Sequence, residues 1–165
     1  MKAWITAAVL AAVAWPAAAQ EAAAPAAADG AGEFKIEVPK GAHDYGFAGL
    51  LARDNRTDLP PLTLSSGKPV AAGTYTLKSG TYYRIKMIAD GTAELALSGG
   101  DFFRSIWINE IVINNIEVRP MGVHSIEFDA AGESEMSFIA IVPGTFKLSI
   151  PGSDSETQSA TFVIQ

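Results

Sequence analysis

The chain has 165 residues, among them 12 basic and 18 acidic residues and no cysteine, and its net charge is −6. The acidic balance argues against a nucleic-acid-binding protein, because such proteins present a basic surface. Without cysteine there is no disulfide, no catalytic thiol and no thiolate metal ligand. With two histidines in the whole chain, a metal site built from several imidazoles is excluded.

The first residues have the three parts of a secretory signal peptide. Lys2 gives a positive start, residues 3–13 form an apolar run, and three alanines at 17–19 supply the small-residue cleavage pattern. The apolar run is shorter than the roughly 20 residues that a transmembrane helix needs. We therefore expect residues 1–19 to be removed, the protein to be periplasmic, and no membrane span to remain after cleavage. An uncleaved anchor is the alternative.

Residues 20–33 are rich in alanine and have almost no large apolar side chain. Such a segment cannot bury enough surface to offset the entropy lost on ordering, so we predict a flexible leader. The remaining residues, 34–165, suffice for one domain with a real core and are too few for two.

Short apolar segments separated by glycine and proline turns make up the rest of the chain. Alternation of apolar and polar residues predicts half-buried strands, and residues 136–142, apolar on both faces, predict a central buried strand. The clearest expected strands are 74–77, 81–88, 93–97, 136–142, 145–150 and 160–164, with two more within 102–118. Since no long segment has a helical period, the pattern predicts an all-β protein, a β-sandwich of about seven to eight strands.

Two segments resemble bacterial exported cupredoxin-like proteins, which have the blue-copper fold. The first, residues 89–105, ends in Phe-Phe-Arg-Ser and is similar to the part that places the first copper-binding histidine. The second, residues 142–153, is similar to the last hairpin, where a Pro-Gly-Thr-Tyr turn leads to the copper-binding cysteine and a Pro-Gly-His. The resemblance covers roughly residues 74–165 and implies a cupredoxin-like Greek-key β-sandwich.

The resemblance places the copper-ligand positions on residues that do not hold copper. These degenerate positions are Leu95 for the first histidine, Ile150 (or Leu148, counted back from Pro151) for the cysteine, Ser153 for the second histidine and Gln158 for the axial methionine. A blue copper site needs two imidazoles and a thiolate. We therefore expect the type 1 site to be lost and no cofactor to be bound.

An aromatic cluster lies where the resemblance places the approach to the metal. It consists of Phe102, Phe103, Arg104 and Trp107. Alternation along a strand would leave at least one large ring near the surface, and exposed aromatic and arginine side chains are typical binding anchors. The cluster predicts an interaction surface. The alternative is a core aromatic cluster with Arg104 solvated at its edge.

Three residues are weak candidates for a metal site of another kind: Met121, His124 and Met136. Exported copper carriers use methionine and histidine for Cu(I), a soft ion that these ligands suit. On this interpretation the protein is a periplasmic copper-handling protein with a non-blue site and a copper ion as cofactor. The alternative is a loop methionine and a partly exposed strand histidine.

Neither histidine lies in a recognisable Ser/His/Asp setting, and the chain has no nucleophile elbow or phosphate-binding loop. We therefore expect no enzymatic activity. The sequence favours a periplasmic binding or accessory module whose partner is an unidentified protein or small molecule and not a nucleic acid.

Overall fold

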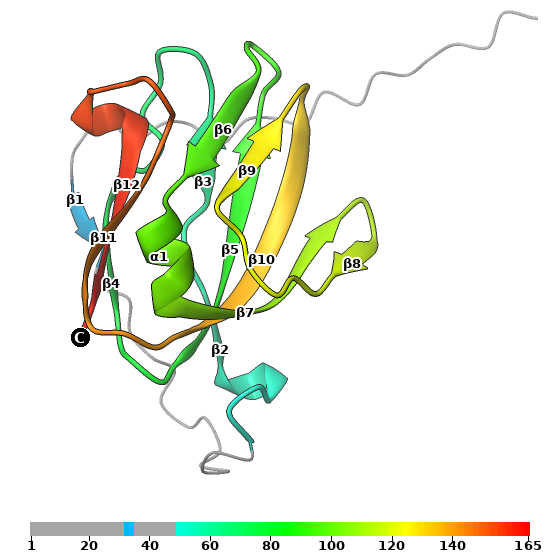
Figure 1. The fold of residues 1–165 in the computed structure, drawn as a ribbon, viewed down its shortest axis with the longest axis vertical. Coiled ribbons are helices and arrows are strands. Elements are labelled where there is room, and N and C mark those ends of the chain that lie inside the picture. The colour runs from blue at the N-terminus through cyan, green and yellow to red at the C-terminus, as the bar shows by residue number, and fades with distance from the viewer. Residues whose placement is uncertain (1–31, 35–48) are drawn as a thin grey trace, which may run out of the picture.

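The structure is a computed structural model that describes residues 32–34 and 49–165 (Figure 1). Within them, twelve strands form two six-stranded sheets. The first sheet has, in spatial order, β1 (Gly32–Phe34), β4 (Gly73–Leu77), β12 (Ser159–Ile164), β11 (Gly144–Ser149), β6 (Leu95–Ser98) and β9 (Ser125–Phe128). The second has β2 (Arg56–Asp58), β5 (Tyr82–Ala89), β10 (Gly132–Ala140), β7 (Ile106–Ile113) and β8 (Ile116–Val118), with β3 (Leu62–Leu64) also paired to β5.

The predicted all-β sandwich is confirmed. The described residues hold more strands than the seven or eight expected, because four of them have only three residues each. The described residues include one α-helix, α1 (Gly100–Ser105), and two short 3-10 turns, η2 (Arg53–Asn55) and η3 (Glu156–Gln158). None of the helices in the described part of the chain has the length and apolar character needed to cross a membrane.

The core fills the space between the two sheets. In β12, Ala160, Phe162 and Ile164 are buried and alternate with half-buried residues, as a strand with one face toward a core requires. The ring of Phe162 stacks on that of Tyr75 with centroids 4.8 Å apart. The predicted central strand is confirmed as β10, which lies between β5 and β7 and is buried from Met136 onward.

The N-terminal boundary of the sheet lies slightly earlier than the expected domain start. Gly32 and Glu33, the last two residues of the expected leader, belong to β1 and pair in parallel with Gly73 and Thr74 of β4. The expected signal peptide at 1–19 and the rest of the expected leader lie outside the described residues.

The expectation of two strands within 102–118 is correct from Ile106 onward and wrong before it. Residues Gly100–Ser105 form α1, in which the Ser105 hydroxyl donates to the carbonyl oxygen of Phe102 at 2.7 Å. Consecutive helical residues are only about 100° apart around the axis, so Phe102 and Phe103 both reach the core and are both buried. Strand alternation therefore does not apply to these two rings.

Asp90 ties the turn after β5 to the loop after β3. Its carboxylate accepts hydrogen bonds from the Ser65 hydroxyl at 2.5 Å, from the Thr92 hydroxyl at 2.6 Å and from the Thr92 amide at 3.0 Å. These bonds, that from Ser65 first, lower the pKa of Asp90 from its ordinary 3.8 to about 2.

We expect the stabilisation from this carboxylate to be complete above about pH 4 and to disappear as the pH falls to about 2, because the folded-state pKa lies below that of the unfolded chain. Urea unfolding of the wild type and of Asp90→Asn should show the wild type more stable at about pH 5, with the difference shrinking toward about pH 2. A difference that stays constant over this range would contradict the assignment.

Candidate functional site

The four positions that the sequence resemblance matches to copper ligands lie toward one end of the sandwich. Three of them lie in the connection from β11 to β12, where the Ile150 amide donates to the Gln158 carbonyl at 3.0 Å and the Ser153 amide to the Ile150 carbonyl at 3.2 Å. The fourth, Leu95, begins β6. Because β6 runs antiparallel to β11 from the Ser98–Ser149 pair, Leu95 lies toward the same end.

These positions do not fit a blue copper ion. Ile150 and the alternative Leu148 are buried core residues, and Leu95 packs against the core. The Gln158 side-chain amide donates to the carbonyl oxygen of Lys68 at 2.7 Å, which ties η3 to the loop after β3. The four positions offer no imidazole and no thiolate, the donors that a type 1 site requires, and the chain has no cysteine to supply one.

The structure does not bring the three candidates of the Met/His site together. Met121 is fully exposed, whereas Met136 is completely buried in β10. His124 is exposed, with its Nδ1 atom 3.5 Å from the Ser98 hydroxyl. In residues 32–34 and 49–165, no three His, Cys, Asp or Glu side chains are grouped so as to hold a metal ion.

The predicted interaction cluster is divided between core and surface. The rings of Phe102 and Phe103 are buried, with the Phe102 centroid 4.3 Å from that of Phe162. Trp107, on β7, is 46% exposed. Arg104 is also exposed and its Nη2 lies 2.6 Å from Oδ1 of Asp101, one turn earlier on α1. Arg104 and Trp107 are thus the cluster members available to a partner.

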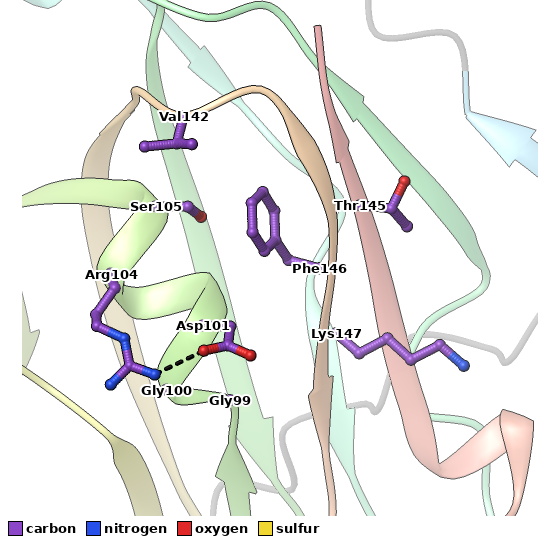
Figure 2. Close-up of a pocket in the computed structure, with 9 residues that line it drawn as sticks. All are labelled: Gly99, Gly100, Asp101, Arg104, Ser105, Val142, Thr145, Phe146 and Lys147. Atoms are coloured by element: carbon purple, nitrogen blue, oxygen red, sulfur yellow. Dashed lines mark hydrogen bonds and ion pairs between the residues drawn. The ribbon is translucent and has the colours of Figure 1, made fainter.

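A pocket of about 500 Å³ opens between α1 and β11 (Figure 2). It is lined by Gly99, Gly100, Asp101, Arg104, Ser105, Val142, Thr145, Phe146 and Lys147. Of these, the sequence singled out Arg104 as a functional candidate and missed the rest. The Gly99-Gly100 pair was the available signal. A Cβ atom at Gly99 would lie only 2.4 Å from the carbonyl oxygen of Lys147, so glycine allows the start of α1 to approach β11.

The side chains of β11 alternate about the pocket. Figure 2 shows Phe146 directed into the space beside α1, with Thr145 and Lys147 directed away from it. The Lys147 ammonium lies 3.0 Å from the Glu156 carboxylate. Thr145 and Lys147 therefore line the pocket with their backbones.

The hydrogen-bond pattern of β11 gives the direction of those backbone groups. β11 pairs with β12 along its whole length. The bond from the Ile150 amide to the Gln158 carbonyl continues the same register. Because bonding alternates along an antiparallel pair, Leu148, Phe146 and Gly144 bond to β12. The N–H and C=O groups of Thr145 and Lys147 point the other way, toward α1.

No strand covers this edge of β11 within the described residues. β6 pairs with β11 at Ser149, and then the chain turns into α1 at Gly100. Gly99 packs against the Lys147 carbonyl oxygen, so the pocket combines a sheet edge that is open at Thr145 with the apolar side chains of Phe146 and Val142. A free edge is a template for an extended backbone, and the apolar side chains provide contact area for the side chains of a ligand. The arrangement is suited to binding an extended peptide by strand addition.

No family profile matches the chain, and no curated protein matches it in sequence. Among solved structures, it is similar to the laccase-like multicopper oxidase CueO from Ochrobactrum sp., with 9% identity, a TM-score of 0.50, and coverage of 68% of this chain and 32% of that one. It also matches the copper nitrite reductase from Nitrosomonas europaea, with 16% identity, a TM-score of 0.45, and coverage of 56% and 33%. The chain spans about a third of the length of each.

At these sequence identities the similarity concerns the fold alone. The evidence for the fold is the match with the TM-score of 0.50. The fold is cupredoxin-like, as the resemblance in sequence implied. Both of these structures are of copper proteins.

Proposed function

We propose that the chain is an exported, periplasmic, non-enzymatic cupredoxin-like binding module that lacks a type 1 copper site and takes an extended peptide segment of a partner protein in the pocket between α1 and β11. The peptide adds a strand to the free edge of β11. The observation that carries the proposal is the unpaired backbone of Thr145, with the N–H of Lys147, that faces this pocket. The signal-like N-terminus supports the periplasmic address.

The state of the pocket's ionisable groups supports binding rather than catalysis. Asp101 and Arg104 pair with each other, and Lys147 pairs with Glu156. Ser105 is buried, and its hydroxyl donates to the carbonyl oxygen of Phe102. A serine nucleophile needs an adjacent base, and the hydroxyl is here engaged with a backbone carbonyl instead.

The test starts with peptides selected by the purified protein from a display library of random seven-residue sequences. The affinity of a selected peptide is then measured by calorimetry for the wild type, Thr145→Pro and Thr145→Ala. Proline removes the Thr145 N–H that faces the pocket, and it leaves the β12 ladder intact because Thr145 does not bond to β12. We expect Thr145→Pro to weaken binding by roughly tenfold or more, and Thr145→Ala to bind nearly as the wild type does.

A folded-state control is circular dichroism of both variants, which should match the wild type. Equal affinity of the proline and alanine variants would overturn strand addition at this edge. Failure to enrich any peptide would overturn the choice of an extended peptide as ligand.

A further inference from the structure

The β7–β8 hairpin carries apolar side chains that the rest of the molecule does not cover. Ile113, Ile116 and Val118 are 40%, 65% and 42% exposed. Ile113 pairs with Ile116, and Ile111 pairs with Val118. Since directly opposed residues share a face of the sheet and Ile111 is buried, the three exposed side chains lie on the core-facing side. They extend this side beyond the core, where the hairpin projects from the sandwich (Figure 1).

The outer edge of β8 has a defined hydrogen-bonding pattern. Asn114 and Asn115 both have positive φ, 48° and 66°, as a two-residue type I′ turn requires. The turn closes with a bonded pair between Ile113 and Ile116. Alternation then directs the backbone groups of Glu117 and Arg119 away from β7. β8 ends the second sheet within the described residues, so these groups form an open edge.

The edge is complementary in charge to itself when two copies run antiparallel. With the two-fold axis at Val118, Glu117 of each copy lies directly opposite Arg119 of the other. Both residues direct their backbone groups outward, as this pairing requires. The neighbouring register, with the axis at Glu117, sets two carboxylates opposite each other, which is unfavourable. Charge complementarity therefore favours a second copy of this chain as the partner, paired in the register with the axis at Val118.

From this geometry we infer that the chain forms a two-fold dimer through antiparallel pairing of β8 with β8 of a second copy. Opposed Val118 side chains lie on the axis, on the same face of the sheet as the exposed Ile116 beside them. Within one chain, Arg119 contacts Glu110 at 3.1 Å. It also contacts Glu117 at 3.5 Å, and the Arg119 and Glu117 side chains are each about 60% exposed. Such an exposed pair contributes little, so Glu117 is free to exchange it for the second copy's Arg119. The inference does not depend on the peptide pocket.

Sedimentation equilibrium of the purified protein over a range of concentrations tests the dimer. We expect the wild type to reach the dimer mass. Glu117→Arg and Arg119→Glu should each weaken the dimer by about tenfold or more, since each replaces two attractive cross-pairs by repulsive ones. The double variant Glu117→Arg/Arg119→Glu should restore dimerisation, because the pairs re-form with reversed sign.

Glu94→Arg is the matched control, since it makes the same change of charge at an exposed residue far from β8 in the sequence. It should leave the dimer unchanged. A wild type that stays monomeric would overturn the inference. A dimer unaffected by either single charge reversal, or single variants that the double reversal does not rescue, would overturn the proposed register.

Discussion

Phe102→Ala is expected to lower the free energy of unfolding by about 3–5 kcal/mol, as removal of a fully buried aromatic ring does in other cores. The Phe102 ring is completely buried. It contacts the rings of Phe103, Phe138 and Phe162 with centroids 5.7, 5.9 and 4.3 Å away. Its loss leaves a cavity where α1 meets both sheets. Urea unfolding followed by circular dichroism measures the effect.

Trp107→Ala is the control, because this aromatic residue of the same sequence cluster is half exposed. Its change should be small, within about 1 kcal/mol, and be caused by lost surface packing. Comparable destabilisation by the two substitutions would contradict the division of the cluster into a buried and an exposed part.

Met136→Ala is expected to cost about 2–5 kcal/mol, the range for truncation of a buried methionine. Met136 lies in the middle of β10, paired with Ile85 of β5 and with Ile111 of β7. Its side chain is completely buried, so it serves as core. The free energy of unfolding from a urea titration is again the measurement.

Met121→Ala should leave the stability unchanged within about 0.5 kcal/mol, since Met121 is fully exposed. Titration of the wild type with Cu(I) is expected to show no binding tighter than about 1 µM, because the three Met/His candidates are not gathered. Tight Cu(I) binding lost in Met121→Ala would contradict this account and support the copper-handling alternative.

Most strands could be predicted from the sequence, because the apolar–polar alternation of a strand and the glycine or proline turns that end it are visible within a few residues. Met136–Ala140 is the clearest example, because a run that is apolar apart from the small Ser137 has no solvent-facing parity. The helix at Gly100–Ser105 was missed because six residues are too few to display a helical period. Its two adjacent phenylalanines are also compatible with a strand.

The pocket could not be derived from local signals, because its free edge depends on where β6 stops. Pairing of β6 with β11 ends at Ser98 and Ser149, and the next residue but one already belongs to α1. The chain contains no pattern at Thr145 or Lys147 that marks an unpaired backbone. Only the register of β11 with β12 reveals which groups face outward.

The positions that the resemblance matches to copper ligands and the pocket lie toward different ends of β11. Ile150, one of the two residues matched to the cysteine by the resemblance, follows the last residue of β11. Thr145, on the free edge, is the second residue of that strand. The binding surface that we propose is built from backbone groups rather than from the positions matched to copper ligands.

Amide hydrogen exchange resolved by NMR, with and without a selected peptide, tests the central claim most directly. In the free protein, the amides of Phe146 and Leu148 should be protected by β12, and those of Thr145 and Lys147 should exchange rapidly. Peptide binding should slow exchange at Thr145 and Lys147 and leave Phe146 and Leu148 as they were. Protection of Thr145 and Lys147 in the free protein, or no protection of them in the complex, would contradict the account.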